Sequence, residues 1–297
     1  MKSFAIFVLL LFPAYGIAQG TSVGEASLKF LFPARTLAMA QATIADTEDA
    51  TTSFANPACL AFGNSLQLSF SQMQWIQDIQ SQILNSSVPL WGGNAALAIS
   101  STNVADIPVR EVPGPPIGSF TAHSTVFQLG YGLDILTDVS VGVMAKYLYD
   151  KLYIDEASGY GVDIGAIYRA PLEGLAFGAA VTNVGRMSAF RSESTDLPTK
   201  IDIGADYSVS VGDLDIVGAL ALGKETMSGG TSQLQVGGEA TYGKLLSLRA
   251  GYQTGYDVRG LTAGLGISYS MFQVDYAYIP FSQGFGNANI ITVGVKF

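Results

Sequence analysis

The chain has 297 residues, of which 48% are apolar and only 13% charged, and it contains 34 glycines. Its charged fraction is about half that of an ordinary soluble domain, and a net charge of −9 gives no attraction to phosphate backbones, so we expect no nucleic-acid partner. One cysteine, Cys59, and one histidine, His123, exclude a disulfide framework and a clustered Cys/His metal site.

The first residues are typical of a secretory leader. Lys2 is followed by an apolar run over residues 4–11, and the small residues Gly16 and Ala18 stand three and one positions before a cut after Ala18. We therefore expect a signal peptide over residues 1–18, with an N-terminal helical anchor as the alternative. No later window has the roughly 18 uninterrupted apolar residues of a membrane helix. An outer-membrane β-barrel and a secreted β-protein with a large core remain as destinations.

Residues 19–63 carry no strand pattern. The apolar spacing from Leu28 to Met39 suggests short helical pieces interrupted at Pro33, and the acidic stretch 46–49 comes before a turn at Asn56-Pro57. We expect these residues to form a segment that comes before the first strand and plugs the barrel.

From about Ser65 to the end, apolar residues alternate with small or polar ones at the period of a strand. The segments are about nine to twelve residues long, which suits tilted strands that cross a bilayer. Residues 64–297 are therefore predicted to form an all-β transmembrane antiparallel barrel of about fourteen strands. We expect strands to begin near residues 66, 81, 94, 120, 138, 158, 173, 199, 213, 232, 245, 260, 271 and 288.

The connections between these segments alternate in length. Even connections are short, as at 134–138, and odd ones are longer, as at 186–198, which is the pattern of periplasmic turns and external loops. The segment Asn103 to Ser119 holds four prolines, too many for a strand ladder, and predicts a loop. It could be a rigid surface loop, a partner-docking loop or a loop that constricts the pore.

The two faces of the segments differ in chemistry. The apolar face should meet lipid, with tyrosines in the interfacial girdles, unless it forms the core of a sandwich. The girdle candidates are Tyr147, Tyr149, Tyr168, Tyr242, Tyr252, Tyr269, Tyr276 and Tyr278. The inner face combines glycines with charges that we expect to pair with one another: Asp163, Asp202, Asp206, Asp215, Glu239, Asp275, Lys146, Arg169, Arg249 and Lys296. Small inner residues leave room for water, a ligand or the plug.

The sequence offers little for catalysis. His123 and Ser124 are neighbours on a strand, where adjacent side chains point to opposite faces, so a hydrolytic dyad is not favoured. The glycine pairs lack the strand-to-helix context of a phosphate-binding loop, and Cys59 is expected to pack as a small hydrophobe. We expect no enzyme activity, no cofactor and no metal site.

The plug and its junction with the first strand resemble the PorV/PorQ family of Bacteroidota-type outer-membrane proteins, which is similar in turn to the FadL group of channels for hydrophobic compounds. The resemblance is carried by the pairs Lys29-Phe30 and Ala34-Arg35 and by the junction motif Asn56, Pro57, Ala58 and Leu60. It continues to the terminal alternation Ile291, Val293, Val295 and Phe297, which looks like the signal read by the barrel-assembly machinery.

The resemblance implies a non-enzymatic outer-membrane barrel that takes part in type IX protein secretion by binding translocon subunits or the signal domains of cargo. The alternative is a FadL-like channel for hydrophobic small molecules. The implied partners are outer-membrane lipid, the barrel-assembly machinery and type IX secretion proteins or cargo. The implied location is the outer membrane of a Gram-negative, Bacteroidota-type bacterium.

Overall fold

The computed structural model describes residues 26–110, 113–190, 194–227 and 230–297. The expected signal peptide over residues 1–18 lies outside these ranges. Within them, no helix is both long and apolar enough to cross a membrane.

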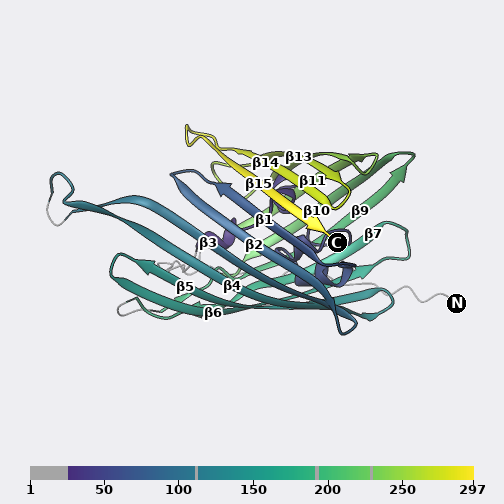
Figure 1. The fold of residues 1–297 in the computed structure, drawn as a ribbon, viewed down its shortest axis with the longest axis horizontal. Helices are drawn as coiled ribbons and strands as arrows, with labels where there is room; N and C mark the ends of the chain where they lie inside the picture. Colours follow the sequence, from purple (N-terminus) through teal and green to yellow (C-terminus); the bar gives the residue numbers. More distant parts are fainter. Residues whose placement is uncertain (1–25, 111–112, 191–193, 228–229) are drawn as a thin grey trace.

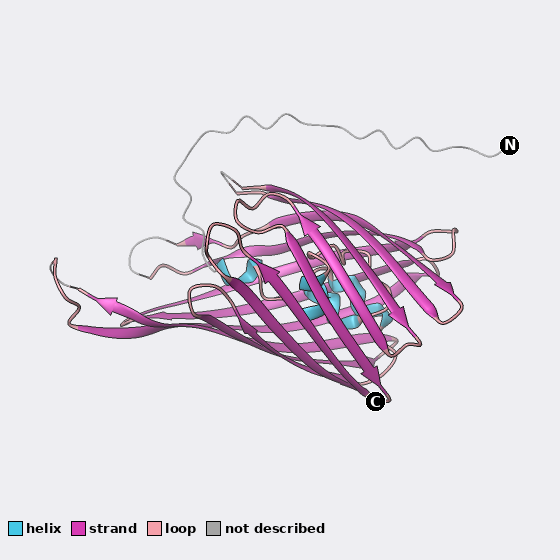
Figure 2. Ribbon diagram, turned by 90° about the horizontal axis from the view of Figure 1, so that it is seen from above, coloured by secondary structure: helices cyan, strands magenta, loops and turns pink. Residues whose placement is uncertain are grey.

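The described chain forms a closed antiparallel barrel around a short helical plug (Figures 1 and 2). Each strand pairs with its neighbour in sequence apart from β8, a two-residue strand beside β7, which leaves fourteen longer strands in the described wall. The barrel closes where β1 pairs with β15, from Gln67 opposite Lys296 to Gln74 opposite Asn289. The strands are β1 (Gln67–Gln74), β2 (Ile79–Leu90), β3 (Gly93–Val109), β4 (Gly118–Leu136), β5 (Val139–Leu152), β6 (Asp155–Arg169), β7 (Leu175–Met187), β8 (Thr195–Asp196), β9 (Lys200–Val211), β10 (Leu214–Glu225), β11 (Ser232–Tyr242), β12 (Leu246–Gln253), β13 (Leu261–Tyr269), β14 (Phe272–Pro280) and β15 (Asn287–Lys296).

This architecture confirms the predicted fold class, and each of the fourteen longer strands begins within three residues of its expected start. A closed sheet pairs every strand edge, as the interior of a bilayer requires because it offers no water to unpaired amides.

The outer face of the wall is apolar. On β13, for example, Leu261, Leu265 and Ile267 are each at least half exposed and point away from the lumen. No element in the described chain covers this face, so it is available to hydrocarbon rather than to a second sheet. The alternative of a sandwich core is therefore wrong. Tyr168, Tyr242 and Tyr269 lie outward near one end of the barrel, and Tyr147, Tyr252 and Tyr278 lie outward near the other, as expected for two interfacial girdles.

The two ends of the barrel differ. At the end we call the turn end, connections such as 91–92 and 212–213 are tight, whereas the loop end carries most of the longer connections. The prediction of a loop over Asn103 to Ser119 is wrong in extent. Strands β3 and β4 continue to Val109 and Gly118, and a register shift between Val104 and Ile107 absorbs the irregularity. The resulting hairpin projects away from the barrel mouth (Figure 1), so its described part does not constrict the lumen.

The plug lies inside the barrel (Figure 2). It consists of four short helical pieces, η1 (Ala26–Lys29), α1 (Ala34–Ala38), η2 (Ala50–Phe54) and η3 (Pro57–Phe62). The break at Pro33 and the turn at Asn56-Pro57 occur as the sequence predicts: Pro33 comes just before α1, and Asn56 caps η3. The described plug begins in the loop-end half of the lumen and leads into β1 at the turn end.

Candidate functional site

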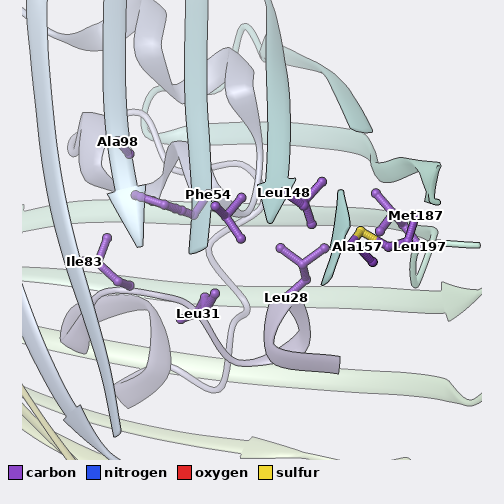
Figure 3. Close-up of a cluster of buried hydrophobic side chains, with 10 residues drawn as sticks. Leu28, Leu31, Phe54, Ile83, Ala98, Leu148, Ala157, Met187 and Leu197 are labelled. Carbon is purple, nitrogen blue, oxygen red and sulfur yellow. The ribbon is translucent and has the colours of Figure 1, made fainter. Parts of the chain in front are cut away.

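The lumen has three layers along the barrel axis, and the layer nearest the loop end is apolar. We call its wall residues the apolar layer: Ile83, Ala98, Val126, Leu148, Ala157 and Met187, one on each strand from β2 to β7. All are buried, and they pack with Leu28, Leu31 and Phe54 of the plug (Figure 3). Inward positions of a membrane barrel are normally polar, so this apolar wall is unusual and requires an explanation.

Further around the barrel, strands β1, β14 and β15 also place buried apolar side chains against the plug. Met73, Ile279 and Ile290 are fully buried and pack with Leu37 of the plug. Strands β11 and β12 instead place buried glutamines at this height, including Gln235, which is opposite Gln253. The loop-end half of the lumen therefore combines these apolar side chains with buried polar and charged ones, which also include Gln128, Lys146, Asn183, Asp202 and Glu225.

The middle layer is a belt of inward-facing glycines against which the plug backbone lies. A Cβ at Gly251 would be 2.7 Å from the backbone nitrogen of Ala40, and a Cβ at Gly264 would be 2.5 Å from the Cβ of Ala38. Only glycine permits such a close approach. The belt comprises Gly130, Gly132, Gly142, Gly165, Gly178, Gly204, Gly237, Gly251 and Gly264. Of the three uses expected for small inner residues, the structure shows accommodation of the plug.

The junction motif predicted from the sequence joins the plug to this belt. The Asn56 side chain accepts a hydrogen bond from the Ala58 N–H at 3.0 Å and donates to the carbonyls of Ile44 at 2.7 Å and Ala166 at 3.3 Å. Pro57 lies against Gly142, while Ala58 and Leu60 are fully buried. The motif thus fixes the inner half of the plug to β5 and β6.

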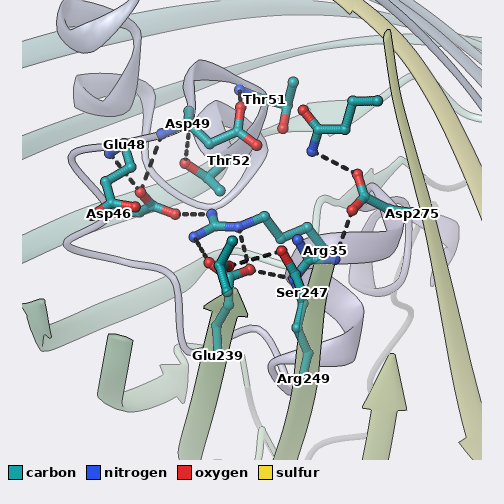
Figure 4. Close-up of polar contacts among 12 residues, drawn as sticks. Arg35, Asp46, Glu48, Asp49, Thr51, Thr52, Glu239, Ser247, Arg249 and Asp275 are labelled. Atoms are coloured by element: carbon teal, nitrogen blue, oxygen red, sulfur yellow. Dashed lines mark hydrogen bonds and ion pairs between the residues drawn. The ribbon is translucent and has the colours of Figure 1, made fainter. Parts of the chain in front are cut away.

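The third layer, nearest the turn end, is charged (Figure 4). Arg35 of α1 donates from Nε to Oε2 of Glu239 at 3.0 Å and from Nη2 to Oε1 at 3.1 Å, and it also pairs with Asp46. Arg249 pairs with the same Glu239 and donates from Nη1 to Oδ1 of Asp275 at 2.6 Å. Every one of these side chains is at most 7% exposed, and the alternation of charge links the plug to β11, β12 and β14.

Ionisation within the plug follows from this environment. Burial alone would lower the pKa of Arg35, but Asp46 and Glu239 outweigh it and raise that pKa well above its ordinary value. Burial alone would raise the pKa of Asp49, but Lys296, 3.9 Å away, together with Arg35 and the Thr51 N–H, lowers it. Both side chains are therefore held in their charged forms.

A chamber of about 870 Å³ lies beside the charged layer at the turn end. Its lining includes Arg35, Glu48, Glu239 and Lys296 and the turn around Glu173. Two much smaller voids, of about 30 and 20 Å³, lie in the loop-end half, and both border Phe32 and Phe54. The large space is thus polar, and the apolar layer is almost completely filled by the plug.

The expectation that inner charges pair with one another is confirmed for most of them. Besides the charged layer, Lys146 pairs with Asp163 at 2.7 Å, and Asp202 pairs with Lys200 at 2.8 Å. Arg169 pairs with Asp134 at 3.1 Å near the turn end. In addition, Asp215 accepts a hydrogen bond from Ser210 at 2.5 Å, and Asp206 is buried in the wall of β9.

The terminal residues Ile291, Val293 and Val295 lie on β15, where Ile291 and Val293 are about half exposed on the outer face. Phe297 follows β15 and its backbone N–H donates to the Leu66 carbonyl at 2.9 Å, beside the closing seam. These placements suit a lipid-facing closing strand, and the assembly signal itself stays a prediction.

His123 and Cys59 are both explained by their contacts within the fold. His123 lies on β4, opposite Asn103 of β3, and its Nδ1 is 2.5 Å from the Asn103 side-chain oxygen. Cys59 is fully buried beside Ala45 and Ile167, and burial raises the pKa of its thiol. It packs as the small hydrophobe that was expected.

Sequence reasoning missed the role of Arg35, which it treated only as part of a helical piece. Glu239 and Arg249 were assigned to the inner face, but a third partner from the plug was not expected. A signal was present: Arg35 is the one charged residue between Phe30 and Ala45. A lone charge in so apolar a segment requires a partner when it is buried.

The comparisons with known proteins agree on the fold. No protein-family model matches the sequence, and no curated protein matches it. Among solved structures, the chain is similar to the monoaromatic hydrocarbon channel CymD, with a TM-score of 0.60, 12% identity, and 90% of this chain and 97% of that chain covered. It is also similar to a FadL homologue of Pseudomonas aeruginosa (TM-score 0.56, 11% identity, 90% and 98% covered) and to the toluene transporter TodX of Pseudomonas putida (0.54, 9%, 81% and 91%). These likenesses show a FadL-like outer-membrane barrel fold.

Proposed function

We propose that the protein is a channel for hydrophobic small molecules in the outer membrane of a Gram-negative bacterium, with its loop end at the cell surface. The observation that carries this proposal is the apolar layer, an apolar wall that Met73, Ile279 and Ile290 continue, inside a barrel whose inner face elsewhere is mostly small, polar or charged. The fold shared with hydrocarbon and toluene channels supports the same function. The sequence alternative of a FadL-like channel is thus favoured over a role in secretion.

The plug divides into a part that is fixed and a part that can move. Residues 34–63 contact the glycine belt and the charged layer, whereas residues 27–32, which we call the outer plug segment, mainly cover the apolar layer. The Lys29 side chain, which is 29% exposed, pairs with Glu225 at 3.0 Å, and the Lys29 carbonyl accepts a hydrogen bond from the Gln41 side chain at 3.3 Å. Displacing this segment would uncover the part of the apolar layer that Leu28 and Leu31 cover, while Phe54 and the contacts with the belt stay in place.

A small apolar molecule that enters the apolar layer regains part of the free energy lost when side chains of the outer plug segment are exposed. A ring of phenyl size buries about 200 Å² of apolar surface, which stabilises it by about 5 kcal/mol at about 25 cal/mol per Å². Exposing one side chain such as Leu28 costs about 2 kcal/mol, and the segment also holds Phe30, Leu31 and Phe32, so one bound molecule offsets a local shift of the segment rather than its full exposure. The voids beside Phe32 are too small for such a molecule, so binding requires the outer plug segment to shift.

Uptake of radiolabelled toluene by cells that express the protein tests the proposal. We expect saturable, protein-dependent uptake, and we expect Val126→Thr to reduce it several-fold because the new hydroxyl lies in the apolar layer. Val143→Thr is the matched control, since Val143 is 46% exposed on the lipid face of the adjacent strand. Uptake equal to that of cells without the protein would overturn the proposal.

The role in type IX secretion stays a prediction that rests on the resemblance of the junction motif and the closing strand. Affinity purification of the tagged protein tests it, and recovery of a secretion-pore subunit or of cargo would support it. Normal levels of secreted cargo in a deletion strain would count against it.

A further inference from the structure

An aromatic cluster at the loop end joins the plug to the barrel. Trp75 lies in the connection between β1 and β2, and the Phe30 ring of the outer plug segment stacks on it, with centroids 4.8 Å apart and planes at 13°. Phe281, in the connection between β14 and β15, meets the same indole edge-on at 5.4 Å and 81°. Trp75 therefore has both a parallel and a perpendicular aromatic neighbour.

Arg259, in the connection between β12 and β13, is a third barrel residue beside Trp75, and we call Trp75, Phe281, Arg259 and Tyr256 the frame. Its guanidinium carbon is 5.4 Å from the Trp75 ring centroid and 4.0 Å from that of Tyr256, and the residue is only 7% exposed. The backbones of Arg259 and Phe281 form an isolated antiparallel β-bridge. The Tyr256 hydroxyl accepts a hydrogen bond from the Gln233 side chain at 2.9 Å. The frame thus consists of barrel residues that hold one another in place.

Phe30 is the only plug residue among these ring contacts in the described chain. It lies in the outer plug segment, next to the partly exposed Lys29. Its phenyl ring occupies one face of Trp75 in a parallel geometry. Whatever replaces it there must be flat and about one ring in size.

We propose that Trp75, Phe281 and Arg259 form a binding site for a single planar aromatic ring, which Phe30 occupies in this structure. Aromatic rings stack through their quadrupoles, and an arginine beside the indole favours electron-rich rings. A ligand that displaces Phe30 also removes one anchor of the outer plug segment, so binding promotes opening of the apolar layer. This inference rests on the proposed function and narrows its substrate class to aromatic compounds.

Fluorine NMR of protein labelled with 5-fluorotryptophan tests the site, because the chain has only Trp75 and Trp91. Trp91 is 88% exposed in a turn at the opposite end and reports nonspecific partition. Titration uses toluene, with methylcyclohexane as a puckered molecule of equal carbon number. We expect toluene to shift the Trp75 resonance saturably and the Trp91 resonance only linearly, while methylcyclohexane moves both linearly.

A variant tests the competition with Phe30. In Phe30→Leu, the half-saturating toluene concentration at Trp75 should fall roughly two- to tenfold, the equivalent of one aromatic pair. Phe285→Leu is the matched control, since Phe285 is 44% exposed at the same end and should leave the value unchanged. An unchanged half-saturation in Phe30→Leu, or parallel linear shifts at both tryptophans, would overturn the inference.

Uptake measurements separate this inference from the proposed function. If toluene and methylcyclohexane both enter in a protein-dependent way but Trp75 gives no saturable response, the channel stands and the aromatic site fails. If neither compound enters through the protein, the channel itself fails, whatever the response at Trp75.

Discussion

The Arg35 guanidinium of the plug and the Glu239 carboxylate of β11 form two parallel hydrogen bonds, at 3.0 and 3.1 Å, across a sequence separation of 204 residues. The same carboxylate pairs with Arg249, so one acidic side chain bridges two buried guanidinium groups, whose other acidic partners are Asp46 and Asp275. Charged fork-to-fork pairs of this kind combine strength with a fixed geometry. They orient the plug in the lumen more specifically than apolar packing can.

Replacing Glu239 by glutamine should therefore loosen the plug and lower stability. The change removes the carboxylate that both buried arginines share and leaves each with a single acidic partner, Asp46 or Asp275, so we expect a loss of about 3 kcal/mol in the free energy of unfolding. Urea unfolding in lipid vesicles measures it. Lys151→Gln, in the exposed pair of Lys151 with Glu156, is the control and should leave the midpoint unchanged. Equal midpoints for both variants would contradict the role of the charged layer.

The glycine belt predicts that a side chain at Gly142 displaces the plug. A Cβ there would overlap the backbone of Pro57, and valine would enlarge the overlap. Cys59, two residues further along, is the natural reporter, because it is fully buried and its raised thiol pKa slows labelling at neutral pH. We expect Gly142→Val to label about tenfold faster with a maleimide.

The control for that experiment is Gly218→Val on β10. A Cβ added at Gly218 would have no neighbouring atom within 4 Å, and the residue faces lipid. Labelling of Cys59 in this variant should therefore remain as slow as in the unsubstituted protein. Equal labelling rates in the two variants would show that the belt does not hold the plug.

The lowered pKa of Asp49 makes part of the stability depend on pH. The folded protein binds this proton more weakly than the unfolded chain, whose aspartate pKa is about 3.9. The contribution of ionised Asp49 to the free energy of unfolding is thus complete above the unfolded pKa. It is lost as the pH falls through the lower pKa of the folded protein. We expect the gap in unfolding free energy between the unsubstituted protein and Asp49→Asn to narrow below about pH 4. A gap that stays constant down to pH 2 would contradict the assigned environment.

The wall of the barrel was predictable because alternation is a local property of the sequence. The outward position of Val143 and Tyr147, for example, follows from period two alone once lipid is the surrounding solvent. The projecting hairpin was not predictable in the same way. The four prolines of this segment predict a loop, yet Pro108 pairs with Ser119 at the far end of β3, beyond a register shift.

The layers of the lumen were less predictable, because they arise from contacts between distant residues. The sequence indicated small and charged inner residues, but not that Gly264 would meet Ala38 or that Arg35 would meet Glu239. The apolar layer does not follow from the sequence, because Leu148 departs from the mostly polar and small inner face of its strand. Only the position of Leu28 inside the barrel gives that departure a meaning.

The most direct test of the account locks the outer plug segment in place. Lys29→Cys and Glu225→Cys, introduced together with Cys59→Ala, can be joined by a bis-methanethiosulfonate linker that a reductant cleaves, since the native side chains meet at 3.0 Å. Toluene uptake should be lost on linkage and return on reduction, whereas the linker should have no effect on Lys29→Cys alone. Undiminished uptake through the linked protein would contradict the claim that this segment covers the path of the ligand.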